Sequence, residues 1–287
     1  MIAVFKREFK SYFIGMTGFL FAALLLLFTG IFATQFHLLG GYASFEYTLQ
    51  STCTVLLLVV PLLTMRSLVE DKRARTDRLL YSLPLKISQI ILGKYLAMLA
   101  VFAIPTLIIA LYPLILSTFG AVNLASAYAC LFAFFLLGAA LLALCLFLST
   151  LADSQVIAAI LGFGAVFLLY IIRSISAMIP SSSTVSLVCL VVIGILIALV
   201  SYYLTRNIAI TGGVGAICII PTMIVFLMNR SLFDGLFPAI LSKLALFNRF
   251  ESFVYGIFDI PAVLLYLSFS IFFVTLTVLA AEKKRWS

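Results

Sequence analysis

Charged and catalytically useful side chains are scarce in this chain of 287 residues. Only 10% of its residues are charged and 65% are hydrophobic, whereas about a quarter of a soluble domain is charged. The sequence holds one histidine and neither an HExxH nor a GxSxG motif, so it has little material for metal-dependent or hydrolytic chemistry. We therefore expect a protein that is not an enzyme and that binds no metal or cofactor itself.

A nucleotide-binding loop is also missing. The phosphate-binding pattern GxxxxGK[ST] does not occur, because the one Gly-Lys pair, Gly93 and Lys94, is followed by Tyr95 and begins an apolar stretch. Acidic residues do not lie deep in the apolar stretches, where proton- or sodium-coupled carriers place them. Any ATP and magnesium on which this protein depends would therefore be bound by a separate chain.

Long apolar stretches make up most of the chain, from near residue 13 to near residue 282. A membrane core takes roughly 20 apolar residues per helix, and these stretches lack the alternation of a barrel strand. Because unpaired backbone amides are costly in lipid, we predict an all-α bundle of six to eight transmembrane helices, with eight preferred. The candidate spans are residues 13–33, 49–67, 92–117, 125–149, 155–176, 185–204, 209–228 and 262–281.

An even number of spans places both ends of the chain on one side of the membrane. All but four of the 18 basic residues fall on that side, the exceptions being Arg173, Arg230, Lys243 and Arg249. By the positive-inside rule we predict that both termini are cytoplasmic, in a bacterial-type inner membrane. This topology explains the net charge of +8, so we expect membrane lipids and not nucleic acid as partners.

Residues 1–12 have the pattern of an amphipathic helix. Apolar residues recur at helical spacing, and basic residues fill positions between them. The apolar residues are Ile2, Phe5, Phe9 and Tyr12, and the basic residues are Lys6, Arg7 and Lys10. Such a helix would lie in the headgroup region and lead into the first span. The alternative is a frayed end whose charges only set the topology.

The one long charged region runs from Arg66 to Tyr95, on the predicted cytoplasmic side. Oppositely charged residues there lie three or four positions apart, which would stabilise a solvated helix, and a leucine-rich edge follows. Pro84 should end that helix, after which residues 86–95 restart one that feeds the third span. This elbow, residues 66–95, has a shape suited to docking on a partner, although a solvated loop would have the same composition.

Two further segments are predicted to lie on the outer side. Residues 229–261 are apolar but too charged to cross the membrane comfortably, so we expect an outer-leaflet interfacial helix or a re-entrant hairpin with aromatic anchors. Those anchors are Phe247, Phe250, Phe253 and Tyr255. The loop 34–48, with His37 and Glu46, has no partner set for catalysis and is predicted to be a solvated cap.

The elbow resembles the cytoplasmic loop between the second and third spans of ABC type-2 (ABC-2) transporter permeases. The stretch EDKRARTDRLLYSLPLKISQIILGKYLA (residues 70–97) holds that family's acidic-basic run, Leu-Leu-x-Ser-Leu-Pro step and Ile-x-x-Gly-Lys segment. Residues 241–286 are similar to the end of the gliding-motility-type branch, with its Phe-x-x-Phe-x-x-Phe pattern and basic-Trp terminus. FKREFKSYF (residues 5–13) is similar to the family's opening helix, so the resemblance covers essentially the full length.

This resemblance implies the membrane-spanning permease subunit of an exporter driven by a separate cytoplasmic ATPase. It implies a dimer, with itself or with a sister permease, over two ATPase subunits. The N-terminal helix, through Phe5, Lys6, Arg7, Phe9 and Lys10, and the elbow would contact the ATPase. The implied coupling residues are Glu70, Asp71, Arg73, Arg75, Asp77, Arg78, Leu79, Leu80 and Leu83. The basic family unit has six spans. Because eight are preferred here, the resemblance leaves undecided which helices line the transport pathway.

Two other functions are compatible with the same spans. An ion- or proton-coupled carrier would transport without ATP, which the shortage of charge inside the spans disfavours. A noncatalytic membrane scaffold would hold partners together and move no substrate. Copurification of an ATPase and nucleotide-dependent transport discriminate between these possibilities and a permease.

Overall fold

The computed structural model describes residues 1–70, 86–180, 182–192 and 230–286, with isolated positions at 195, 222, 223 and 226. The chain divides into two compact units, one of residues 1–170 and 246–287 and the other of residues 171–245. Every secondary-structure element in these described ranges is a helix. The predicted all-α class is therefore confirmed.

Six of the described helices are long and apolar enough to cross a membrane. They are Thr17–Leu39, Glu46–Thr64, Ile87–Ser117, Leu124–Leu151, Gln155–Ile172 and Ile260–Lys283. Each overlaps one of the predicted spans. Of the remaining two predictions, 185–204 is described only over residues 185–192, within a short helix over Ser183–Val192, and at residue 195. The prediction 209–228 lies outside the described residues except at 222, 223 and 226.

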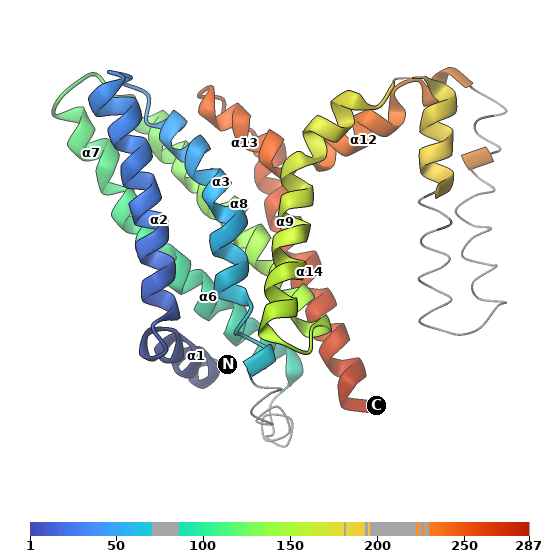
Figure 1. The fold of residues 1–287 in the computed structure, drawn as a ribbon, viewed down its shortest axis with the longest axis horizontal. Coiled ribbons are helices and arrows are strands. Elements are labelled where there is room, and N and C mark those ends of the chain that lie inside the picture. The colour runs from blue at the N-terminus through green and yellow to red at the C-terminus, as the bar shows by residue number, and fades with distance from the viewer. Residues whose placement is uncertain are drawn as a thin grey trace. The chain divides into compact units, whose positions relative to one another are not determined.

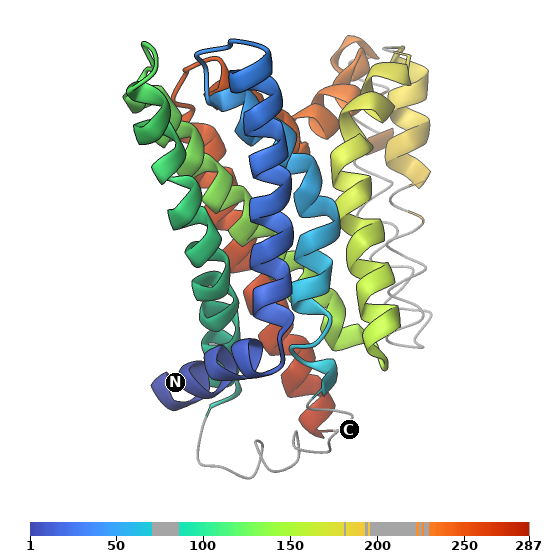
Figure 2. The same cartoon turned by 60° about the vertical axis from the view of Figure 1, so that its left-hand side comes forward.

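α8 (Leu124–Leu151) lies at the centre of the first unit. It packs against α14 (Ile260–Trp286), α3 (Glu46–Thr64) and α6 (Ile87–Ile109), and these helices run side by side in Figure 2. α8 and α6 approach closely because Gly138 has no side chain: a Cβ there would lie 2.3 Å from Phe102 Cε1. The core of this unit is therefore built around α8.

α2 (Thr17–Ala33) runs beside α3 and continues into the π-helical turn η1 (Thr34–Leu39). His37 on this turn bonds to the segment that leads into α3. Its ring nitrogens lie 2.6 Å from Tyr42 O and 3.0 Å from Thr48 Oγ1.

Glu46 is the first residue of α3, and its position corrects one prediction. It is only 5% exposed, and the neighbouring Phe45 is fully buried. The loop 34–48 is therefore not a solvated cap at this point. The chain turns inward here, and the N-terminal end of a helix is the end that favours an acidic side chain.

The outer segment predicted over residues 229–261 consists of short helices. They are the 3-10 turn η2 (Arg230–Phe233), α12 (Leu236–Leu244) and α13 (Leu246–Val254). In the second unit, the Ser186 hydroxyl accepts a hydrogen bond from the Phe237 backbone N–H of α12 at 3.5 Å. The Ser176 hydroxyl on α9 (Gln155–Met178) donates to Pro238 O at 2.9 Å.

α13 belongs to the first unit, where it packs on α8 and α3 at the end opposite α1 (Figure 1). Phe250 and Phe253 are each 1% exposed, so the prediction that they anchor the segment in lipid is wrong. They fill the core instead, because α13 lies on other helices of its unit. Arg249 Nη1 lies 3.6 Å from Asp259 Oδ2.

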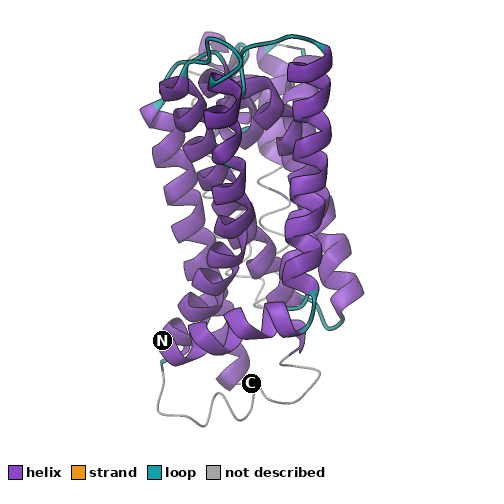
Figure 3. Ribbon diagram, turned by 90° about the vertical axis from the view of Figure 1, so that its left-hand side faces the viewer, coloured by secondary structure: helices purple, strands orange, loops and turns teal. Residues whose placement is uncertain are grey.

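α1 (Ile2–Ile14) lies across one end of the first unit, below the upright helices in Figure 3. Gly15 and Met16 separate it from α2, and Met16 adopts the left-handed conformation with φ 59°. This conformation ends one helix and lets the next start in another direction. α14 ends at the same end of the unit (Figure 2), as an even number of spans requires.

Candidate functional site

α1 packs against α6, and every fourth residue on its inner side is buried. Val4, Glu8 and Tyr12 are 6%, 9% and 4% exposed. Gly93 of α6 makes this approach possible: a Cβ there would lie 3.1 Å from Val4 Cγ1 and 3.3 Å from Met1 O. Because Gly93 has no side chain, α1 can pack directly on the backbone of α6.

Lys94 follows Gly93 and brings an ammonium group into this contact, although its side chain is only 1% exposed. Its Nζ lies 3.2 Å from Glu8 Oε1 and donates a hydrogen bond to Ser67 O at 2.7 Å. A buried charge is tolerated when it is paired and hydrogen-bonded. Lys94 therefore joins three segments: α1, α6 and the turn that follows α3.

Arg66 links that turn to the corner between α1 and α2. Its Nη2 lies 2.9 Å from Glu70 Oε1, its Nε also donates to the Glu70 carboxylate, and its Nη1 donates to Gly15 O at 3.3 Å. The hydrogen bond to Glu70 raises the pKa of Arg66, so this side chain stays charged. The start of the elbow is thus bonded to the N-terminal corner.

Two buried hydroxyl groups in this region, Tyr12 Oη and Ser67 Oγ, form no hydrogen bond of good geometry in the described part of the chain, although Ser67 lies close enough to Tyr12 to oppose the rise in the pKa of Tyr12. Burial, together with the negative charge of Glu8, raises the pKa of Tyr12. The Tyr12 hydroxyl therefore stays protonated at neutral pH. We call the group the junction: Glu8, Tyr12, Arg66, Ser67, Glu70 and Lys94.

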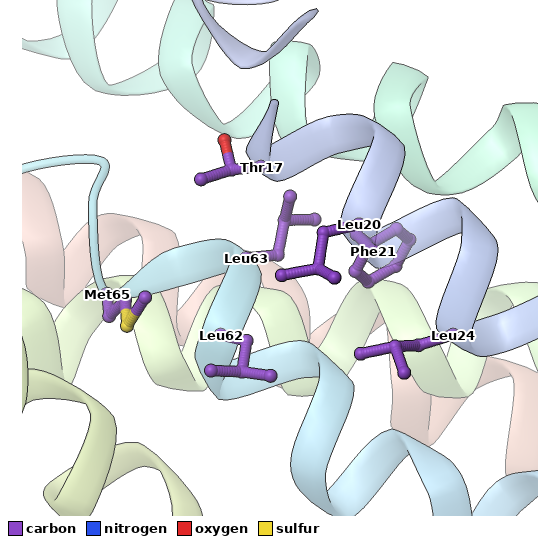
Figure 4. A pocket seen from close by; sticks show the side chains of 7 residues that line it. All are labelled: Thr17, Leu20, Phe21, Leu24, Leu62, Leu63 and Met65. Carbon is purple, nitrogen blue, oxygen red and sulfur yellow. The ribbon is translucent and has the colours of Figure 1, made fainter. Parts of the chain in front are cut away.

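A small hollow lies beside the junction, between α2 and α3 (Figure 4). It measures about 30 Å³ and is lined by Thr17, Leu20, Phe21, Leu24, Leu62, Leu63 and Met65. A hollow of this size has room for water but for nothing much larger. The hydroxyl of Thr17 is the polar group of this lining, and it donates to Tyr12 O at 3.4 Å. The hollow is too small for a substrate.

A larger hollow of about 280 Å³ lies between α6 and α8. The two hydroxyl groups in its lining are bonded to backbone: Thr106 Oγ1 to Phe102 O at 2.8 Å and Tyr128 Oη to Ala110 O at 3.1 Å. The rest of the lining is apolar, formed by Ala103, Leu107, Leu131, Phe132 and Phe135. Neither of these two hollows presents a charge that would select a substrate.

Over the described ranges, no group of three or more His, Cys, Asp or Glu residues could hold a metal ion.

The structure describes the predicted residues of α1 and one predicted coupling residue. Lys6, Arg7 and Lys10 are exposed, and Phe5 and Phe9 are half-buried. The described coupling residue is Glu70, which pairs with Arg66. The other predicted coupling residues lie outside the described residues: Asp71, Arg73, Arg75, Asp77, Arg78, Leu79, Leu80 and Leu83.

Sequence reasoning missed Glu8, Tyr12 and Lys94 as parts of one site. Two signals were available. Glu8 is the only acidic residue before Glu46. Lys94 falls inside the predicted third span, where a lysine needs a partner. In the sequence, the Gly93-Lys94 pair does not form a phosphate loop and belongs to the Ile-x-x-Gly-Lys segment of the resemblance, whereas in the structure it seats and bonds α1.

The comparison with protein families agrees with this architecture. Residues 5–212, well over half of the chain, match the family described as "ABC-2 family transporter protein". The match includes α1 from Phe5 onward, the elbow and α6. Comparison with curated proteins gives no match, and neither does comparison with solved structures. With six helices able to span a membrane, the chain is a multi-pass membrane protein that belongs to the ABC-2 family of transporter proteins.

Proposed function

We propose that this chain is the permease subunit of an ATP-driven exporter whose ATPase is a separate cytoplasmic chain. The observation that carries the proposal is that Lys94 contacts both Glu8 and Ser67 O, at the point where the elbow leaves α3. A partner that pushes on the elbow would move α1, α3 and α6 together, because these contacts tie them at one end. This is the mechanical requirement for coupling to an external motor.

In this proposal the elbow, residues 66–95, is the surface that meets the ATPase. Arg73, Arg75 and Arg78 supply charge to the contact, and the leucine edge of Leu79, Leu80 and Leu83 packs on the partner. ATP and magnesium are held by the ATPase. Closure of the ATPase pair on ATP would press on the elbow and tilt the attached spans toward an outward-open path.

The assembly is a dimer of this chain, or of this chain and a sister permease, over two ATPase subunits. It lies in a bacterial-type inner membrane with both termini in the cytoplasm, as the distribution of basic residues favours. α1 lies in the headgroup layer. The similarity of residues 241–286 to the gliding-motility-type branch supports a place in that branch of the family.

The test is affinity purification of the tagged full-length protein from native membranes in mild detergent, followed by identification of partners and an ATPase assay. We expect a stoichiometric ATPase that carries a phosphate loop. Reversing three charges with Arg73→Glu, Arg75→Glu and Arg78→Glu should abolish its copurification, because the elbow would then repel the surface that it fits.

A control variant with Arg230→Glu and Lys243→Glu reverses two exposed charges outside the elbow and should keep the ATPase bound. If the elbow variant retains both the ATPase and its stimulation, the coupling residues are wrongly assigned. If no ATPase copurifies with wild-type protein from active membranes, the permease proposal fails, and a scaffold or an ion-coupled carrier takes its place.

A further inference from the structure

α1 carries a row of aromatic rings next to its buried side. Phe5, Phe9 and Phe13 follow one another at four-residue spacing, with ring centroids 5.9 and 5.1 Å apart. The row continues onto α2, where the Phe19 ring centroid lies 5.1 Å from that of Phe13. Phe19 is 58% exposed in the first turn of a candidate membrane span. The row therefore joins the surface of α1 to the lipid-facing side of α2.

Two lysines stand beside this aromatic row. Lys6 and Lys10 lie one turn apart on α1, each directly after a ring residue, and both are exposed. Glu8 is the acidic residue of α1, and it is turned to the other side of the helix, where it pairs with Lys94 and Arg7. The outer surface of α1 therefore bears positive charge that its own carboxylate does not neutralise.

The position of α1 along the spans sets its depth in the membrane. α2 begins at Thr17, directly after the corner that ends α1, and α1 packs on Gly93 in the first two turns of α6. A helix at this level, with rings on one side and lysines beside them, meets lipid headgroups and the upper part of the acyl chains together.

We propose that α1 and the first turn of α2 form a binding site for an anionic phospholipid. Lys6 and Lys10 hold the phosphate of the headgroup, and Phe13 and Phe19 line one acyl chain. Charge complementarity selects an anionic headgroup, because a zwitterionic lipid brings no net charge to the two lysines. An acidic protein surface would match the lysines but not the rings, whose row continues onto a membrane span. The proposal rests on the interfacial position proposed for α1 and not on ATP-driven transport.

The test uses the full-length protein purified in detergent and supplemented with either phosphatidylglycerol or phosphatidylcholine. Phosphatidylglycerol should raise the midpoint of thermal unfolding above the value in phosphatidylcholine, because a ligand bound to the native state stabilises it. The double variant Lys6→Gln, Lys10→Gln should lose most of this rise while its midpoint in phosphatidylcholine stays unchanged. The double variant Lys6→Arg, Lys10→Arg should keep the rise.

Two controls distinguish a local lipid-binding site from general electrostatic attraction between the protein and anionic lipid. Lys86→Gln with Lys243→Gln removes the same charge from exposed lysines outside α1 and should keep the rise. Glycerol 3-phosphate added in phosphatidylcholine should produce no rise, because it lacks the acyl chain that Phe13 and Phe19 would line. The proposal is overturned if the Lys6 and Lys10 glutamine variant keeps the rise, if both glutamine variants lose it equally, or if glycerol 3-phosphate reproduces it.

Two further measurements distinguish this site from the proposed ATPase contact. Native mass spectrometry of the wild-type protein should show phosphatidylglycerol retained in preference to phosphatidylcholine, and equal retention would contradict the site. If the glutamine variant at Lys6 and Lys10 loses a copurifying ATPase while the thermal rise persists, the two lysines belong to a protein contact instead. The thermal test uses this chain expressed and purified without an ATPase, so its outcome is independent of the permease proposal.

Discussion

The ammonium group of Lys94 lies 3.2 Å from the carboxylate of Glu8, and their side chains are 1% and 11% exposed. A buried ion pair adds little net stability, because both charges lose their hydration, but removing one partner is costly. The two residues come from segments far apart in the sequence, so their contact reports whether α1 is seated on α6. Mutations that test the junction should therefore be made at this pair.

Glu8→Gln should destabilise the protein by about 3–5 kcal/mol, because it removes the carboxylate that faces the buried ammonium group of Lys94. Lys94→Met should cost less, since Arg7 still lies 2.6 Å from Glu8. The double variant should cost less than the sum of the two single variants. The check is a double-mutant cycle by thermal unfolding in detergent. Additivity within about 0.5 kcal/mol would show that the two side chains do not act as a pair.

Gly93→Leu should push α1 away from α6, because the space where its Cβ would sit is already bounded by Val4 and Met1. Overpacking of this kind costs about 1–3 kcal/mol. Hydrogen exchange of the α1 amides should become faster in the variant. Gly164→Leu is the matched control, since no atom beyond the adjoining backbone of its own helix lies within 4 Å of a Cβ at Gly164. Equal exchange in α1 for both variants would contradict the close approach at Gly93.

Tyr12→Phe should leave stability unchanged or raise it by about 1 kcal/mol, because the lost hydroxyl is buried and makes no hydrogen bond of good geometry in the described chain. The variant should also alter the response to alkali. The pKa of Tyr12 is raised above the usual 10.0 in the fold, so the unfolded chain loses this proton first. The contribution of Tyr12 to stability is therefore constant below about pH 10 and falls as the pH rises above it.

Unfolding midpoints measured between neutral pH and pH 11 test this second effect. Wild-type protein should lose more stability than Tyr12→Phe over the alkaline part of the range. Tyr42→Phe serves as a control, because Tyr42 is 57% exposed and should follow the wild type. Parallel alkaline losses in wild type and Tyr12→Phe would show that the Tyr12 hydroxyl is not closed off from solvent.

Met16→Gly should stabilise the corner between α1 and α2. The left-handed conformation at Met16, with φ 59°, costs a side-chain-bearing residue about 1 kcal/mol that glycine does not incur. Met16 is 73% exposed, so little packing is lost. Ile14→Gly, at an equally exposed position within α1 (71%), should have the opposite effect and cost about 0.5–1 kcal/mol. A lower thermal midpoint for Met16→Gly than for wild type would argue against a strained corner.

The membrane helices could be predicted from sequence because a long apolar stretch is a local property. Their ends were harder to place. The first span was predicted from residue 13, yet Phe13 belongs to α1 and α2 starts at Thr17. The corner at Gly15 and Met16 lies between two apolar segments, so hydropathy alone gives no boundary there.

The contacts within the junction could not be predicted, because they depend on how distant segments meet. Helical spacing grouped Tyr12 with Phe5 and Phe9, whereas Tyr12 lies with Val4 and Glu8 on the buried side. The row of Phe5 and Phe9 is apolar, whereas the buried row contains Glu8, so apolar spacing favours the wrong row and only the packing of the unit identifies the buried one. The position of Lys94 inside a predicted span is a signal that this lysine needs a partner, but nothing local in the sequence identifies Glu8 as that partner.

The pairing of Lys94 with Glu8 also determines the order in which the helices of this protein can come together. Synthesis from the N-terminus makes α1 and two membrane helices before Lys94 exists. Until α6 emerges, the Lys94 ammonium group that pairs with Glu8 is absent, and Val4 has no Gly93 against which to pack. The N-terminal helix must therefore wait at the membrane surface and dock only after the third span has been inserted.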